Sequence, residues 1–275
     1  MKDLRGTTAI VTGASRGIGV CIARALAKEG VNLSLAARSE AELEAVRTEM
    51  AALGVKAIAT RCDVTSPDDR ARLIERTEAE LGPVDLLINN AGIETAAHFD
   101  TAPPDDLVQT LEVNLIAAML LTRSVLPGML RRKRGHVVNI ASGAGKVGVP
   151  FAVAYATSKH GLVGLTNSLR CEYLGNPVGF SVVCPGFVND TGMYARWEDE
   201  GAKAPKIVGR SSPDRVAQVV ISCIHKNRGE VMVNKPPLRP LIVLFNAAPR
   251  VMPRAMKLFG YTRTFERVTE IAGRT

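Results

Sequence analysis

Cysteine is scarce in this chain of 275 residues, and its arrangement excludes two kinds of site. The five cysteines are widely spaced, odd in number and without a C-x-x-C pair. This pattern argues against a disulfide framework and against a zinc centre. We therefore expect no metal, and a reducing, cytoplasmic compartment.

Long apolar runs and targeting signals are also missing. No run reaches the roughly 18 apolar residues that span a bilayer, and the N-terminal segment enters a predicted strand without the length or cleavage pattern of a signal peptide. Internal repeats and low-complexity tracts are absent as well. With 46% hydrophobic and 23% charged residues, the chain is typical of a folded soluble protein, and we expect one α/β domain.

The net charge of +8 is unevenly distributed. Residues 1–202 carry 21 basic and 23 acidic residues, whereas residues 203–275 carry 14 and 4. The excess positive charge therefore belongs to the last quarter of the chain, and nothing in the pattern predicts nucleic-acid binding.

A β-branched run at residues 7–12 leads into a glycine-rich turn and then into an apolar-periodic helix. Glycines allow the backbone to approach a pyrophosphate, and the helix N-terminus offers it free N–H groups. The order strand, glycine turn, helix predicts a dinucleotide site, although such a turn alone also serves as a tight connection. The expected contacts are Gly13, Ser15, Arg16, Gly17, Ile18 and Gly19.

An acidic residue is missing where the second strand ends, at Ala37-Arg38-Ser39. NAD-binding units place an acid there to hold the ribose hydroxyls. Arg38 and Arg16 are instead available for a 2′-phosphate, to which a guanidinium binds well. We expect NADP(H) as cofactor; the alternative is that both arginines are only solvated.

Two further strand ends carry polar residues. Asp63 and Val64 follow the third strand, where ligands bind in open α/β sheets, although Asp63 could instead cap the next helix. The buried run 84–92 closes on Asn89, Asn90, Ala91 and Gly92, of which Gly92 permits close approach and Asn89 favours a structural role.

Tyr155 and Lys159 lie four residues apart, on one face of a predicted helix. An ammonium beside a phenol favours the phenolate and eases proton transfer. Ser142 ends a β-rich run, and the loop after it could bring its hydroxyl to the same place. The pair Y-x-x-x-K also occurs by chance on many helices.

Together, Ser142, Tyr155 and Lys159 resemble the active-site signature of the short-chain dehydrogenase/reductase family, over about residues 5–235. The resemblance implies that Tyr155 is the acid/base, that Lys159 lowers its pKa and holds the nicotinamide ribose, and that Ser142 polarises the carbonyl. It also implies a doubly wound, Rossmann-like three-layer fold with a mainly parallel, seven-stranded sheet. The G-x-x-x-G-x-G spacing and the Asn-Asn-Ala-Gly segment match the same family.

Further positions are implied by the same resemblance. Asn114 matches the family's catalytic asparagine, Asp63 and Val64 its adenine-contacting pair, and Asn90, Ala91 and Gly92 its cofactor segment. Pro185, Gly186, Val188 and Thr191 match the segment that closes over the nicotinamide. Taken alone, Asn114 is a mid-helix oddity of local hydrogen bonding.

The predicted helix from about Asp105 to Arg132 is apolar almost all the way round. One face can pack on the sheet and the other needs a second subunit, so we expect a homodimer or homotetramer. The family resemblance implies the same.

Two segments near the C-terminus complete the predicted organisation. Residues 1–235 form the catalytic domain, and about 187–213 within it have the composition of a substrate lid. The alternative for Trp197, within this segment, is an anchor of ordinary packing. Residues 236–275 form a basic and apolar extension. Its portion from Met252 to Ile271 is predicted as one amphipathic helix that begins near Pro253, because proline fits the start of a helix but not its middle. This helix either covers a partner subunit near the active site or lies on an anionic membrane.

The predicted function is an NADP(H)-dependent oxidoreductase that moves hydride between nicotinamide and a carbonyl or secondary alcohol. Two alternatives remain: a catalytically silent nucleotide-binding regulator, and a membrane-surface-associated reductase of lipid-like ketones. The substrate and the direction of the reaction do not follow from the sequence.

Overall fold

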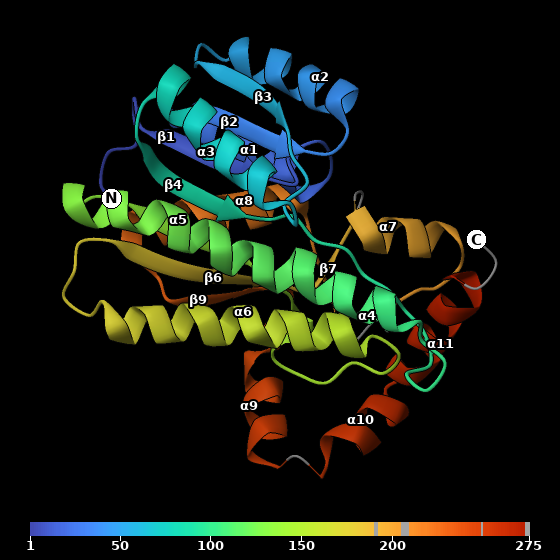
Figure 1. Ribbon diagram of the computed structural model, residues 1–275. Helices are drawn as coiled ribbons and strands as arrows, with labels where there is room; N and C mark the ends of the chain where they lie inside the picture. The colour runs from blue at the N-terminus through green and yellow to red at the C-terminus, as the bar shows by residue number, and fades with distance from the viewer. Residues whose placement is uncertain (190–191, 205–208, 249, 273–275) are drawn as a thin grey trace.

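The chain folds into three layers, with helices on both faces of a central sheet (Figure 1). The computed structural model describes residues 1–189, 192–204, 209–248 and 250–272. The sheet has seven strands, all parallel, in the order β3-β2-β1-β4-β5-β6-β9. They are β1 (Thr8–Thr12), β2 (Asn32–Ala37), β3 (Ala57–Arg61), β4 (Val84–Asn89), β5 (His136–Ile140), β6 (Gly179–Pro185) and β9 (Glu230–Val233). The predicted Rossmann-like fold is confirmed.

The strands are apolar on both sides because helices cover both faces of the sheet. Along β1, Ala9 and Val11 pack with one cluster, whereas Ile10 between them packs with the other. One helix layer holds α1 (Ile18–Lys28), α2 (Glu40–Ala51) and α8 (Pro213–Lys226), and the opposite layer holds α3 (Pro67–Leu81), α5 (Ala117–Arg132) and α6 (Val153–Glu172). The strand order reverses between β1 and β4, so the carboxyl ends of these strands frame the crevice in which such sheets bind ligands.

A long helical segment, Pro104–Arg132, crosses the front of the molecule in Figure 1. It consists of α4 (Pro104–Leu111), a π-helical turn η1 (Glu112–Ile116) and α5. By length and composition it could span a membrane, in a test that tolerates the polar residues which interrupt its apolar runs. A core helix passes it too: its α5 part packs on β4 and β5, and 44% of its most apolar window is buried.

The C-terminal extension forms three helices rather than one. They are α9 (Arg239–Ala247), α10 (Met252–Leu258) and α11 (Tyr261–Ala272). The predicted start near Pro253 agrees with α10, but the single helix to Ile271 is wrong. Gly260 adopts φ 77° between α10 and α11, a left-handed conformation that ends a helix.

The predicted lid segment contributes short elements between the sheet and the extension. These are β7 (Phe187–Val188), α7 (Gly192–Asp199) and β8 (Arg210–Ser211), with β7 and β8 paired in parallel. The Thr264 hydroxyl of α11 donates to the Lys203 carbonyl at 3.0 Å, and Val268 of α11 packs on Ala202. The lid segment and the extension are therefore packed on each other.

Candidate active site

One large cavity opens at the carboxyl ends of the strands, with a volume of about 480 Å³. That volume lies within the usual range of small-molecule sites. The predicted site residues that line it are Gly13, Ser15, Arg16, Gly17, Ile18, Arg38, Asp63, Val64, Asn90, Ala91, Gly92, Ser142, Tyr155, Lys159, Pro185, Gly186 and Val188. Gly19 and Asn114 are buried behind the wall, and Thr191 lies outside the described residues.

The glycine turn that follows β1 is held tightly against the end of β4. The Thr12 hydroxyl accepts hydrogen bonds from the backbone N–H groups of Asn90 and Ala91, at 3.0 and 3.1 Å. The Asn90 amide in turn donates to the carbonyls of Thr12 and Gly13, both at 3.0 Å. Asn90 therefore fixes the loop in addition to lining the cavity.

Glycine is required at two positions of this turn. Gly13 has φ 63°, and a Cβ there would stand 2.9 Å from the Cα of Ala91. A Cβ on Gly19 would stand only 2.2 Å from the Gly13 carbonyl oxygen. Gly19 thus acts through close packing of α1 on the turn, whereas a direct cofactor contact was predicted.

The other end of the cavity holds the two predicted arginines, Arg16 and Arg38. It also holds one carboxylate, Glu42, that was not predicted from the sequence. Arg16 and Arg38 are exposed and line the cavity, as does Glu42 in the first turn of α2. The acid absent from the end of β2 is therefore supplied nearby by α2. Its position three residues after Ser39 was the available signal.

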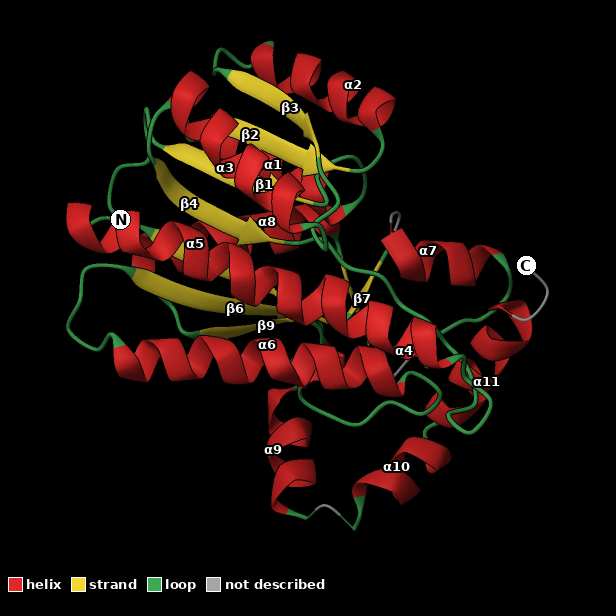
Figure 2. Cartoon of the chain, in the orientation of Figure 1, coloured by secondary structure: helices red, strands yellow, loops and turns green. Residues whose placement is uncertain are grey.

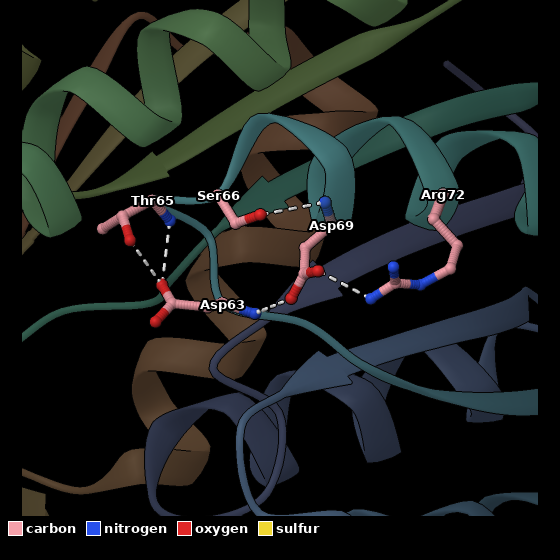
Figure 3. Close-up of polar contacts among 5 residues, drawn as sticks. All are labelled: Asp63, Thr65, Ser66, Asp69 and Arg72. Carbon is pink, nitrogen blue, oxygen red and sulfur yellow. Dashed lines mark hydrogen bonds and ion pairs between the residues drawn. The ribbon is translucent and has the colours of Figure 1, made fainter.

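Asp63 belongs to a polar network at the start of α3 (Figure 3). Its carboxylate accepts from the Thr65 backbone N–H and hydroxyl, at 2.9 and 2.7 Å, and its own N–H donates to Asp69 at 2.8 Å. The Ser66 hydroxyl, not Asp63, caps α3 by accepting from the Asp69 N–H at 3.2 Å. The bonds from Thr65, together with the positive charge of Arg38, lower the pKa of Asp63 and keep it ionised beside the cavity.

Asn89 has the structural role that was expected. Its side-chain amide donates to Asn139 at 2.8 Å and to Thr122 at 3.2 Å, which links β4 to β5 and α5. It is buried and does not line the cavity.

Ser142, Tyr155 and Lys159 meet at one wall of the cavity. Ser142 caps the short helix η2 (Gly143–Gly145), accepting from the Ala144 N–H at 3.2 Å. Tyr155 and Lys159 both lie on α6 and are buried. The Lys159 ammonium lies 5.5 Å from the centre of the Tyr155 ring and donates to the Ile140 carbonyl at 3.1 Å. The loop from β5 and the helix α6 therefore converge as predicted.

The electrostatics of this wall differ from the prediction. Burial raises the pKa of Tyr155 well above its usual value, and the charge of Glu94 raises it further, whereas the Ser142 hydroxyl lowers it. Lys159 was expected to provide the lowering. Its own pKa falls to about 8 because burial outweighs the attraction of Glu94. The phenol is therefore held in its protonated form.

Glu94 is the main site residue that the sequence reasoning missed. It follows the Asn-Asn-Ala-Gly segment by two positions, lines the cavity, and has a pKa raised to about 8 by burial, which the charge of Lys159 opposes. Tyr261 of α11 also lines the cavity. Its charge raises the pKa of Tyr155, and the charge of Glu94 raises the pKa of Tyr261. An acid and a second phenol therefore stand beside the predicted proton donor.

Asn114 positions the loop that carries Glu94. From the π-helical turn η1, its amide accepts from the Ile93 N–H and donates to the Ile93 carbonyl, both at 2.8 Å. It also donates to Ser158 of α6 at 3.1 Å. Such turns inside helices are frequent at functional sites. Here the turn links the Glu94 loop to the helix that bears Tyr155 and Lys159.

The apolar end of the cavity is built largely by the extension. Leu238, Leu241, Ile242, Phe245 and Met256 line it. Aromatic rings from the lid segment and the extension form the adjoining wall: Phe187 contacts Tyr194, Tyr261 and Phe265 at centroid distances of 4.7, 5.8 and 6.4 Å. The extension thus covers the site of its own chain.

The donor set fits a dinucleotide cofactor. The glycine turn presents backbone N–H groups and the N-terminus of α1, and two guanidinium groups stand at one end. Lys159 stands at the other end, 3.4 Å from the position of a Cβ on Gly92. Among the described residues, no cluster of His, Cys, Asp or Glu could hold a metal ion.

Comparison with known proteins places this geometry in a family. Residues 7–201 match the family model for short chain dehydrogenase. A ketoacyl reductase, HetN, of Nostoc sp. is 41% identical over 265 residues, which cover 94% of this chain and 91% of HetN. A putative ketoacyl reductase of Streptomyces coelicolor is 38% identical over 210 residues, covering 76% and 80% of the two chains.

Solved structures agree with the fold and with the cofactor class. An actinorhodin polyketide ketoreductase variant with NADPH superposes with a TM-score of 0.76 at 33% identity, covering 86% of this chain and 97% of its own. A metagenomic short-chain oxidoreductase with NADP gives 0.72 at 36%, covering 84% and 97%. A Burkholderia phymatum short-chain dehydrogenase/reductase with NAD gives 0.81 at 26%, covering 91% and 96%. This chain therefore belongs to the short-chain dehydrogenase/reductase family of oxidoreductases.

Proposed function

We propose that the protein is an NADP(H)-dependent ketoreductase that interconverts a carbonyl compound and its secondary alcohol. The observation that carries this proposal is the meeting of Ser142, Tyr155 and Lys159 at one wall of a cavity that reaches Arg38. When bound there, the nicotinamide would supply or accept the hydride. The ketoacyl and polyketide reductases among the relatives support the same reaction class.

The protein's part in the reaction is to hold the carbonyl and to move one proton. The hydroxyls of Ser142 and Tyr155 would both donate to the substrate oxygen and polarise the carbonyl. As the carbon gains hydride, the Tyr155 phenol gives its proton to that oxygen and becomes a phenolate, which the Lys159 ammonium stabilises. The resting phenol is protonated at neutral pH, as a proton donor in reduction must be.

Tyr155→Phe tests the assignment directly. It removes the proton donor and keeps the ring, so turnover of a panel of ketones, followed by NADPH absorbance, should fall by roughly 10²–10⁴-fold. NADPH binding, followed by fluorescence, should be retained. Ser142→Ala should lower the rate with the same binding intact. Unchanged turnover in Tyr155→Phe would refute the proposed mechanism.

Cofactor preference is the second part of the proposal. Arg16 and Arg38 can bind a 2′-phosphate, whereas Glu42 can accept from ribose hydroxyls, so the two sets favour different cofactors. We propose that the arginines dominate. Arg38→Asp should weaken NADPH by about tenfold or more and strengthen NADH, and Glu42→Gln should change the ratio in the opposite direction. Equal or tighter binding of NADH by the unmodified protein would contradict the NADP(H) preference.

A further inference from the structure

The hairpin formed by α9 and α10 presents two apolar faces. Its inner face, with Leu241, Ile242 and Phe245 of α9 and Met256 of α10, lines the cavity and packs on the body of the protein. Figure 2 shows the two helices projecting away from the layered sheet. The inner face therefore forms part of the cavity wall and is not the surface available to a partner.

The outer face of this hairpin is exposed and apolar. Val243 and Leu244 of α9 are 61% and 54% exposed, Val251 is 46% exposed, and Leu258 at the end of α10 is 82% exposed. None of these four side chains lines the cavity. Four large aliphatic side chains on one short hairpin exceed the scattered exposure that is normal on a monomer surface.

The charge around this outer face has a single sign. Between residues 236 and 265 the sequence holds five basic residues and no acidic one: Arg239, Arg250, Arg254, Lys257 and Arg263. All five are exposed, and none has an ion pair among the described residues. The hairpin and its flanking residues therefore offer exposed aliphatic side chains together with positive charges that have no ion-pair partner among the described residues.

The exposed aliphatic side chains and the positive charge together favour an anionic bilayer over a second copy of the chain as the partner of this face. A second copy of the chain on a two-fold axis would place the same five positive charges against each other, which is unfavourable. An anionic bilayer provides both complements: its headgroups attract the basic side chains, and its acyl boundary accepts the aliphatic ones. Contacts of this kind, without a covalently attached lipid, give reversible association with the bilayer.

Phe259 connects the outer face to the cavity. It lines the cavity and is also 38% exposed, and it follows directly after Leu258. The surface that would meet a bilayer is thus continuous with the apolar wall of the site.

We propose that the outer face of α9 and α10 docks on an anionic lipid surface, and that apolar ketones or alcohols enter the cavity from that surface past Phe259. The docking follows from the surface alone, whereas the substrate class rests on the proposed reductase function. The substrate class is therefore water-insoluble, uncharged carbonyl compounds that partition into the membrane.

The test uses the full-length protein and vesicle flotation. Phosphatidylcholine vesicles are compared with vesicles that contain about 30% phosphatidylglycerol. The unmodified protein should float with the anionic vesicles, bind the neutral ones at least tenfold more weakly, and be released at about 0.5 M salt. No binding to anionic vesicles, or equal binding to both compositions, would overturn the proposal.

Two sets of variants separate the contributions. Leu244→Asp with Leu258→Asp should reduce binding to anionic vesicles at least tenfold, as should Arg250→Gln with Arg254→Gln. Leu174→Asp is the matched control, since Leu174 is 88% exposed at the far end of α6, and it should bind like the unmodified protein. NADPH binding and turnover of a water-soluble ketone should be unchanged in all of them.

Sedimentation without vesicles completes the experiment. If the Leu244 and Leu258 variant changes the oligomer, a second copy covers the outer face and the proposal is wrong. Vesicle binding together with no ketone turnover by the unmodified protein would refute the reductase function but leave the docking intact. Turnover of soluble ketones without vesicle binding would refute the docking but leave the reductase function intact.

Discussion

Glu94 should make the protein less stable as the pH rises. Its pKa is raised from 4.5 to about 8 in the folded protein because the side chain is partly withdrawn from water at the cavity wall. Well below pH 4.5 the carboxyl is protonated in both the folded and the unfolded states and does not change the free energy of unfolding. Between pH 4.5 and 8 the unfolded state loses the proton first, so stability falls, and above pH 8 the loss is complete.

Glu94→Gln should remove this pH-dependent loss. A shift of about 3.5 pKa units corresponds to a ceiling of roughly 5 kcal/mol. Glu94 is only half-buried and faces a cavity that water can enter, so we expect about 2 kcal/mol, or roughly 4–8 °C in Tm for a chain of this size. The glutamine amide keeps the shape of the protonated carboxyl.

Differential scanning fluorimetry from pH 5 to 9 provides the measurement. The Tm difference between Glu94→Gln and the unmodified protein should be small at pH 5 and grow up to about pH 8. Glu78→Gln, at an exposed position on α3, is the control and should show no such growth. A difference that is independent of pH would refute the reasoning.

The same variant should also alter catalysis. The Glu94 charge raises the pKa of both Tyr155 and Lys159, so its removal should move the alkaline limb of the reduction rate to lower pH. A purely structural role for Glu94 would change the amplitude of the rate without moving that limb.

The fold was predictable because its signals are local. Each parallel strand is a short apolar run, and the glycine turn, the Asn-Asn-Ala-Gly segment and the Pro-Gly segment each lie at the end of such a run. The glycine turn after β1 and the Asn90–Gly92 segment after β4 meet at the switch point for that reason. The strand count came from the family resemblance, which carries information that single-sequence periodicity lacks.

Two helix interruptions could not be foreseen. Gly260 ends α10 with a left-handed conformation, although glycine inside an amphipathic pattern is also tolerated within helices. The π-helical turn at Asn114 depends on two hydrogen bonds with Ile93, 21 residues earlier in the chain. The amphipathic pattern of the extension does not indicate the conformation of Gly260. The apolar run around Asn114 does not indicate its contacts with Ile93.

The meeting of Ser142, Tyr155 and Lys159 was predictable, but its electrostatic surroundings were not. Tyr155 and Lys159 share a helix face because they are four residues apart. Glu94 and Tyr261 reach the same wall from a loop and from the extension, which are far apart in the sequence. The packing of the extension over its own site brings Tyr261 beside Tyr155, and the bonds between Asn114 and Ile93 hold the loop that brings Glu94 there.

Two further predictions concern the glycine turn and the outer surface of α5. Gly19→Ala would place a Cβ 2.2 Å from the Gly13 carbonyl oxygen, so the turn must shift and NADPH affinity should fall by about tenfold or more in a fluorescence titration; Gly164→Ala, where a Cβ meets nothing within 4 Å, should leave affinity unchanged. The oligomer expected from the sequence stays a prediction, and we propose that it forms through the α4–α5 segment, where Ile116 and Met119 are 42% and 40% exposed. Met119→Asp would bury an unpaired charge in that interface, at a cost of several kcal/mol, and should shift sedimentation velocity towards the monomer. Leu53→Asp is the control, because Leu53 is similarly exposed at 43% but lies just past α2, in the opposite helix layer. A monomeric unmodified protein, or an unaltered oligomer in Met119→Asp, would exclude this helix as the subunit interface.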